Sequence, residues 1–217
     1  MSIIELSQVG APPSARPHVL AGARRKRALD VVVAGLALLL FLPLLLLIAA
    51  AIRAEGPGEV LFRQARTGLQ GRRFTILKFR TMRPAAASDP EVQQARRGDP
   101  RVTRVGRVLR KLSLDELPQL INVLQGEMSL VGPRPHALSH DAAWAERVPG
   151  YANRFQAKPG LTGLAQVRGL RGEIHDEESL RRRIAADLEY IETWSFAGDL
   201  KLLALTAPRV LFDPCAY

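Results

Sequence analysis

Two adjacent carboxylates, Asp115 and Glu116, are the side chains whose type and setting point most directly to chemistry. They precede an apolar helical pattern of Leu117, Leu120 and Ile121, which places them at the beginning of a helix. A helix N-terminus stabilises an ionised carboxylate and directs backbone N–H groups at a phosphate. An ionised carboxylate can in turn attack phosphorus or bind Mg²⁺.

A purely structural role is the alternative for this pair. Ser113 and Glu116 have the spacing of a capping box, and acidic residues are common in a first helical turn. Pro118 would lie beyond the first turn of a helix capped at Ser113, so a cap at Asp115 accommodates it better.

Cations suited to phosphate occur on a predicted strand. Residues 59–66 and 72–81 are typical of two strands around a glycine-containing turn at 68–71. Strand side chains alternate between faces, so Lys78 and Arg80 share one face and can both reach one phosphate. The alternative is an exposed strand edge that is protected by charge.

Two stiff turns bring further cations, and for each the alternative is a turn without a binding role. The first places prolines on both sides of an arginine, as a rigid contact with a phosphate or a base requires. The residues of the two turns and of the segment that follows are Pro133, Arg134, Pro135, Lys158, Arg168 and Arg171. His136 and His140 are four residues apart without the glutamate pattern of a metal-binding helix, so we interpret them as ordinary polar residues.

The amino-acid composition limits the classes of binding partner that the protein is expected to have. The 217 residues are 47% hydrophobic and 24% charged, as in one medium globular domain with a small appendage. The 31 basic and 21 acidic side chains leave a net charge of +10, which favours nucleic acid, anionic lipid or a phosphorylated small molecule. The single cysteine, Cys215, excludes an intramolecular disulfide and a cysteine-based zinc site.

An uncharged apolar run covers residues 31–52, and as a helix it is about 33 Å long, the thickness of a bilayer's hydrocarbon core. A core helix is the alternative, but little else in the chain could cover it. The run is too long, and its basic residues 24–27 lie too far into the chain, for a signal peptide. Both flanks are basic, which favours one cytoplasmic side for both, and Pro43 bends or breaks a helix. A re-entrant helix broken at Pro43 and a kinked spanning helix both stay open.

These patterns predict a mainly helical α+β protein with a membrane helix, a short β-hairpin and interfacial amphipathic helices. Residues 1–23 are predicted to be a flexible extension, 24–55 the membrane helix and 56–217 a cytoplasmic catalytic domain. The basic residues at 24–27 and the basic amphipathic pattern at 101–112 are interpreted as a grip on anionic headgroups.

Several motifs together resemble the bacterial sugar transferase family, the monotopic phosphoglycosyl transferases. The matching segments are 26–30 (KRALD), 78–82 (KFRTM), 113–120 (SLDELPQL), 131–135 (VGPRP) and 158–167 (KPGLTGLAQV). They occur in the order and spacing of the family, from about residue 24 to the end of the chain.

The resemblance implies an enzyme that transfers a sugar 1-phosphate from a UDP-sugar to undecaprenyl phosphate and releases UMP. This step begins a surface glycan or exopolysaccharide at the cytoplasmic face of the bacterial inner membrane. It implies Mg²⁺ bound at Asp115, which attacks the sugar-bearing phosphate in a dyad with Glu116. Lys78 and Arg110 are assigned to the phosphates, residues 133–135 to the nucleotide, and the helix break to Pro43.

Two departures from the family pattern are visible. Leu42 precedes Pro43, where a serine is common in the family. After the Ala-Gln-Val segment, small family members often have Asn-Gly-Arg, whereas residues 168–171 are Arg-Gly-Leu-Arg. The phosphate-binding arginine therefore stays open between Arg168 and Arg171. The sequence at 187–195 is similar to that of the branch of the family that transfers glucose or galactose 1-phosphate. That branch usually carries extra spanning helices and a further domain, which this sequence does not contain.

Two rival functions were weighed. A nucleic-acid-binding protein would interleave aromatic and basic residues, but only 6% of the residues are aromatic and they lie elsewhere, so no nucleic acid is expected. A membrane scaffold without catalysis would tolerate Asp115→Asn. The identity of the sugar, the acceptor length, the pathway and self-association stay open.

Overall fold

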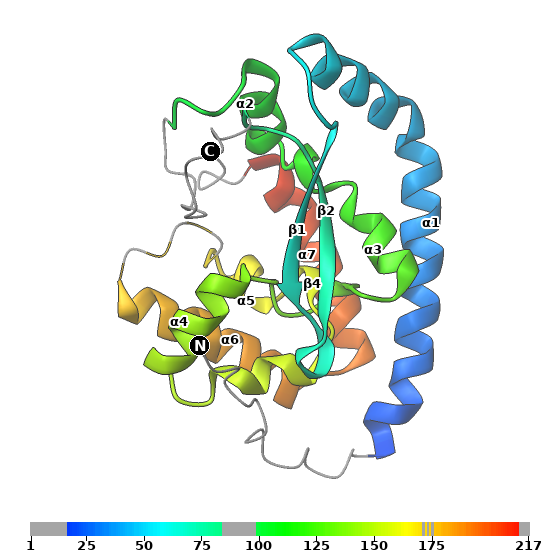
Figure 1. Cartoon of the computed structure of the whole chain (residues 1–217). Helices are drawn as coiled ribbons and strands as arrows, with labels where there is room; N and C mark the ends of the chain where they lie inside the picture. Colours follow the sequence, from blue (N-terminus) through cyan, green and yellow to red (C-terminus); the bar gives the residue numbers. More distant parts are fainter. Residues whose placement is uncertain (1–16, 84–98, 171, 173, 175, 213–217) are drawn as a thin grey trace.

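The structure is a computed structural model that describes residues 17–83, 99–170, 172, 174 and 176–212. Most of these residues are helical, with two small two-stranded sheets, which confirms the predicted α+β class (Figure 1). The α-helices are α1 (Pro17–Ala54), α2 (Arg104–Lys111), α3 (Gln119–Gln125), α4 (Leu138–Arg147), α5 (Leu164–Val167), α6 (Glu177–Glu192) and α7 (Phe196–Phe212). The strands are β1 (Leu61–Thr67), β2 (Arg73–Phe79), β3 (Ser129–Val131) and β4 (Gly160–Thr162). The 3-10 helices are η2 (Leu69–Gly71), η3 (Leu114–Glu116) and η4 (Tyr151–Gln156).

The apolar run forms α1, a single helix of 38 residues that continues through Pro43. Two expectations are therefore corrected: the helix begins at Pro17 and not near residue 24, and Pro43 lies inside it without ending it. A proline is well tolerated in a first turn, and inside a helix it removes one hydrogen bond and bends the axis. Figure 1 shows α1 running along one side of the molecule and bending over towards α2 at its C-terminal end.

The middle of α1 exposes a band of large apolar side chains, which includes Leu36, Leu39, Leu40, Leu46 and Leu47. By length and composition alone, residues 23–54 could cross a membrane, and 11% of their most apolar window is buried. Exposure of so much apolar surface is costly in water, and the band is compatible with a membrane-anchoring helix.

Both ends of α1 pack on the folded domain. Near its C-terminal end, Ile48 and Ile52 are buried in one cluster with Phe79 of β2 and Leu109 of α2. Near its N-terminal end, Arg27 donates to the Val123 and Leu124 carbonyls at the end of α3. Lys26 is likewise bonded inside the domain, so these two cations are not available as a grip on headgroups.

Strands β1 and β2 form the predicted antiparallel hairpin, in which Leu61 pairs with Phe79 and Thr67 with Arg73. The buried Asn122 of α3 holds β2 in place, because its Oδ1 accepts from Leu77 N at 3.0 Å and its Nδ2 donates to Thr75 O at 2.8 Å. The hairpin is thus fixed against the helix that follows the two carboxylates.

The second sheet pairs β3 with β4 in parallel, with Ser129 opposite Gly160 and Val131 opposite Thr162. The stiff turn expected at 158–163 therefore contains a strand. Gly132 comes directly after β3, and its backbone packs against the segment around β4. A Cβ at this position would lie only 2.3 Å from Lys158 O. The main chain that leads to Arg134 is accordingly packed tightly on β4.

The basic amphipathic pattern expected at 101–112 forms a helix that is shorter than predicted, α2. In α2, Leu109 is buried while Arg104 and Arg107 are exposed, and the helix covers only residues 104–111 of the expected 101–112. In α6, Leu180 and Ile184 are buried, and Arg183 is buried with them. The expectation of a flexible N-terminal extension falls mostly on residues 1–16, which lie outside the described residues.

Candidate active site

The two carboxylates lie on η3 and not at the start of α3. Ser113 has a left-handed backbone (φ 56°), and among the described residues its side chain forms no capping hydrogen bond. Because α3 begins only after Pro118, neither the capping box at Ser113 nor the cap at Asp115 is formed. The capping part of the structural alternative is therefore wrong, although both acidic residues lie in the first turn of η3. The tight turn presents Glu116 to the hairpin and to the Pro133–Pro135 loop.

Glu116 is the meeting point of two predicted phosphate-binding cations. Lys78 Nζ donates to its Oε1 at 2.8 Å, and Arg134 donates to Oε1 at 2.6 Å and to Oε2 at 3.2 Å. Glu116 is only 7% exposed, so both ion pairs are partly removed from water, where charge-assisted bonds are strong. This carboxylate joins strand β2 to the loop after β3. The two cations that it binds, Lys78 and Arg134, are 56 positions apart in the sequence.

Asp115 is half-buried, and within the described residues its carboxylate has no hydrogen-bond partner. Burial and the charge of Glu116 raise the pKa of Asp115 above its ordinary value, while Lys78, Arg110 and Arg134 act in the opposite direction. A partly desolvated carboxylate that is not tied by hydrogen bonds is suited to attack a phosphorus atom that nearby cations have neutralised.

Arg80 does not join Lys78. It lies just beyond β2 and donates to the carbonyls of Ile52, Gly56 and Pro57, at 3.1, 3.0 and 2.7 Å. Its guanidinium thus satisfies carbonyls at and after the C-terminal end of α1, a common place for a cation. The two cations of the predicted strand face are used for different purposes.

Three other predicted residues have separate positions. Arg110, near the end of α2, acts electrostatically on Asp115. Arg168 is exposed and bonds both carboxylate oxygens of Glu189, at 2.5 and 2.6 Å. Arg171 lies outside the described residues, so the choice between Arg168 and Arg171 as a phosphate ligand stays a prediction.

The donor set at this site fits a hard divalent cation that is bound mainly by substrate. Asp115 offers one carboxylate without a hydrogen-bond partner in the described part of the chain, whereas Glu116 is occupied by two cations. Over the described residues, no group of three or more His, Cys, Asp or Glu side chains could hold a metal ion. Mg²⁺ is commonly bound through one or two carboxylates together with substrate phosphates and water.

Sequence reasoning missed Arg154, which holds the backbone of Arg134. Arg154 is 2% exposed, and its Nη2 donates to Arg134 O at 2.5 Å and to Asp187 Oδ2 at 2.8 Å. Its Nη1 lies 2.6 Å from His136 Nδ1. Burial and the positive charge of Arg154 hold the pKa of His136 well below its ordinary value, so His136 is neutral and accepts this bond. Arg154 lies in a 3-10 helix without a periodic pattern, and no sequence signal marks it.

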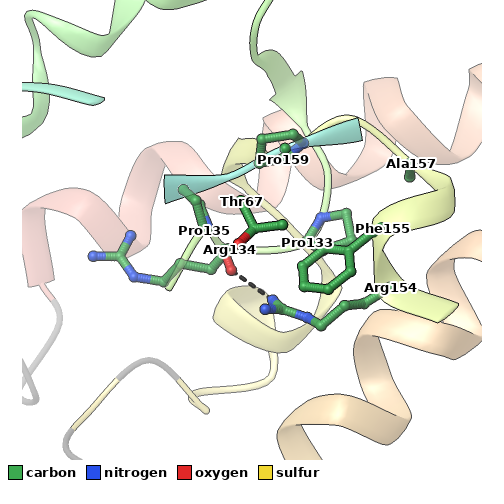
Figure 2. Close-up of a pocket in the computed structure, with 9 residues that line it drawn as sticks. Thr67, Pro133, Arg134, Pro135, Arg154, Phe155, Ala157 and Pro159 are labelled. Carbon is green, nitrogen blue, oxygen red and sulfur yellow. Dashed lines mark hydrogen bonds between the residues drawn. The ribbon is translucent and has the colours of Figure 1, made fainter. Parts of the chain in front are cut away.

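Figure 2 shows how this bond shapes a small pocket beside the site. The Arg134 carbonyl points to Arg154, while the Arg134 side chain extends away from the pocket towards Glu116. Pro133, Pro135 and Phe155 supply apolar walls, and the end of β1 closes one side. The rigid loop expected from its prolines is thus present, and a second arginine completes it.

Two further buried arginines add positive charge. Burial and the charge of Arg134 lower the pKa of Arg66 and of Arg183 to about 10. In the described part of the chain neither forms an ion pair with a carboxylate. The surroundings of Arg134 therefore carry an excess of positive charge, which favours binding of an anion.

Residues 21–213 match the family model described as bacterial sugar transferase. The chain belongs to the bacterial sugar transferase family. Its membership confirms the resemblance drawn from the motifs, and it identifies the protein as a phosphoglycosyl transferase.

Three relatives show the range of similar proteins. A UDP-glucose:undecaprenyl-phosphate glucose-1-phosphate transferase of Caulobacter vibrioides is 61% identical over 193 residues, which cover 89% of this chain and 72% of that protein. The Escherichia coli K12 protein of the same name is 48% identical over 91% of this chain but 43% of its own length. The exopolysaccharide production protein PSS of Rhizobium leguminosarum bv. phaseoli is 44% identical over 82% of this chain and 90% of its own length. The chain thus spans less than half of the E. coli relative.

Proposed function

We propose that the protein transfers glucose 1-phosphate from UDP-glucose to undecaprenyl phosphate, releases UMP and so begins an exopolysaccharide. The names of the relatives support this donor and this acceptor, and they favour glucose over galactose. The observation that carries the proposal is the arrangement around Glu116, where Lys78 and Arg134 converge beside the carboxylate of Asp115. A diphosphate needs such cations, and a covalent mechanism needs such a carboxylate.

In the proposed first step, a carboxylate oxygen of Asp115 attacks the sugar-bearing phosphorus of UDP-glucose. A P–O bond to Asp115 forms while the bond to the bridging oxygen breaks, and UMP leaves with that oxygen and its electron pair. Lys78, Arg110 and Arg134 stabilise the charge that develops on the phosphate oxygens. Bound Mg²⁺ would supply further neutralisation of the diphosphate at Asp115.

In the second step, a phosphate oxygen of undecaprenyl phosphate attacks the same phosphorus. The bond to Asp115 breaks, the carboxylate is regenerated, and the lipid carries a diphosphate with glucose attached. Both substrates thereby use one set of cations in turn. Glu116 acts as the holder of Lys78 and Arg134, because its two ion pairs fix these cations beside Asp115.

We further propose that α1 is re-entrant at the inner membrane, with the catalytic domain on the cytoplasmic face. Lys26 near one end and Ile52 near the other both contact the same folded domain. A straight span would place one of these ends on the far side of the bilayer. The bend of α1 and the exposed basic face of α2 support a shallow position on anionic lipids (Figure 1).

Topology is tested by cysteine labelling in sealed vesicles. With Cys215 changed to serine, single cysteines introduced at Arg25 and at Arg63, both exposed, should react from the same side. Labelling from opposite sides would refute the re-entrant arrangement and leave the reaction proposal intact.

The reaction is tested by UMP release from a panel of UDP-sugars, with undecaprenyl phosphate and Mg²⁺ supplied. UDP-glucose should give the highest kcat/KM, and Asp115→Asn should abolish release while thermal unfolding stays cooperative. Preference for another UDP-sugar would correct the donor, and full activity of Asp115→Asn would refute the catalytic role.

A further inference from the structure

The loop that aims Arg134 at Glu116 is held at the backbone of each successive residue. Three of these anchors come from within the catalytic domain. They are Gly132 N to Thr162 O at 2.8 Å, Gly160 N to Pro133 O at 2.9 Å, and Arg154 Nη2 to Arg134 O at 2.5 Å. Anchors at consecutive residues leave the arginine little freedom, so its direction depends on all of them.

The fourth anchor comes from the membrane helix. Lys26 Nζ of α1 donates to Val131 O at 2.9 Å, the carbonyl that begins the loop. The same ammonium group lies 2.6 Å from Asp199 Oδ2 and 3.3 Å from Tyr190 OH. Asp199 is 0% exposed, so Lys26 cannot turn to a lipid headgroup without leaving a buried carboxylate without its cation.

Asp30 extends this contact by one helical turn. It is 3% exposed, and its Oδ1 accepts from Ser129 Oγ at 3.0 Å and from Leu130 N at 2.9 Å. Lys26 and Asp30 are four residues apart, so both project from one face of α1. Two side chains of the membrane helix therefore hold all three residues of β3, directly before Gly132.

We propose that Lys26 and Asp30 are positioning residues that make turnover depend on the seating of α1 against β3. When α1 shifts, Val131 O loses the Lys26 donor and keeps the weaker bond from Tyr190 OH at 3.1 Å. The loop then loosens, and Arg134 no longer holds Glu116 and the substrate phosphate in place. The membrane helix is then part of the catalytic machinery as well as an anchor. This inference rests on the proposed role of Arg134 in phosphoryl transfer.

The competing explanation is that the basic residues at 24–27 act together on anionic headgroups. Arg24 and Arg25 are exposed and suit that role, whereas Lys26 and Arg27 are bonded inside the domain. The two explanations differ in what a change at Lys26 should affect. A lipid grip predicts weaker membrane binding, and a positioning residue predicts slower turnover in protein that stays bound.

The experiment uses the full chain on vesicles of phosphatidylethanolamine and phosphatidylglycerol. Lys26→Met leaves Asp199 without its cation, so the double variant Lys26→Met/Asp199→Asn removes both charges and preserves folding, with cooperative thermal unfolding as the check. Lys26→Arg is the conservative variant, and Lys201→Met is the matched control, because Lys201 is exposed two residues after Asp199. Three quantities are measured: flotation with vesicles, hydrogen exchange of the peptide 129–134, and kcat for UMP release.

The double variant should float like the unchanged protein, exchange faster at 129–134 and lose roughly ten- to a hundredfold in kcat, as misplacement of a catalytic group does. Lys26→Arg should recover part of the loss, and Lys201→Met should change none of the three quantities. Unchanged exchange and kcat in the folded double variant would overturn the inference, as would a loss of kcat explained by lost flotation. If even the unchanged protein releases no UMP, the proposed function fails, and hydrogen exchange alone still decides the coupling.

Discussion

Arg134→Lys is the change that most sharply probes the site, because it keeps the charge and removes the forked geometry. Arg134 gives Glu116 two hydrogen bonds, at 2.6 Å to Oε1 and 3.2 Å to Oε2. A lysine at 134 can supply only one of these two bonds with comparable geometry, in addition to the bond from Lys78 to Oε1. Lysine is a single point charge on a flexible stem and does not reproduce a bidentate contact.

The magnitude follows from one lost bond to a charged group, which is worth about 1.5–3 kcal/mol. If that bond is required in the transition state, kcat/KM should fall roughly ten- to a hundredfold. Arg134→Met should cost more, because Glu116 would then lose both bonds from Arg134 at a position that is 7% exposed. Breaking a buried ion pair from one side destabilises a protein by about 3–5 kcal/mol.

The assay measures UMP release for kcat and KM, with urea unfolding in parallel. Arg181→Lys is the matched control, because Arg181 also bonds a carboxylate, that of Glu177, but both side chains are more than half exposed. Such a surface pair is worth about 0–1 kcal/mol, so activity and stability should stay nearly unchanged. Unchanged kcat/KM in Arg134→Lys would refute the requirement for a bidentate arginine, and equal losses in the control would refute its specificity.

Two further predictions concern pH and folding. Because the pKa of Asp115 is raised, the acidic limb of the kcat profile should lie at a higher pH than for an ordinary aspartate. Glu116→Gln removes a charge that raises this pKa and should move the limb to lower pH, whereas Lys78→Met should move it to higher pH. Limb movements in the opposite directions would contradict the assignment of the limb to Asp115. Because the folded protein favours neutral Asp115, the contribution of this group to stability is present at acidic pH and is lost as pH rises through the raised pKa. Asn122→Ala should lower the free energy of unfolding by about 2–4 kcal/mol, since it leaves buried backbone groups of β2 without partners; a loss below about 0.5 kcal/mol in urea unfolding would show that the hairpin does not depend on it.

Local patterns predicted the elements well where one face is buried and repetition is strong. The hairpin follows from alternation on both sides of a glycine-containing turn, and the apolar helix follows from an uncharged run long enough for a bilayer. The candidate carboxylates and their cations Lys78 and Arg134 were also identified, because a rigid turn or a strand face limits what such residues can do.

Contacts between segments that are far apart in the sequence could not be predicted from local patterns. Arg80 and Lys26 carry the same charge as Lys78, but backbone carbonyls and buried carboxylates that are far away in the sequence determine where they bind. The cap expected at Ser113 failed because a left-handed residue followed by a 3-10 turn replaces the regular start of α3. Arg154 has no periodic neighbours at all, so only the folded backbone reveals that it holds Arg134.

The most direct test of the central claim is to look for the covalent intermediate on Asp115. The protein is incubated with UDP-glucose labelled in the sugar-bearing phosphate, without undecaprenyl phosphate, and is then denatured and analysed by mass spectrometry. We predict one glucose 1-phosphate group on the peptide that contains Asp115, its absence in Asp115→Asn, and its discharge when the lipid acceptor is added before denaturation. Undiminished transfer by Asp115→Asn, or label on another residue that the acceptor discharges, would contradict the account.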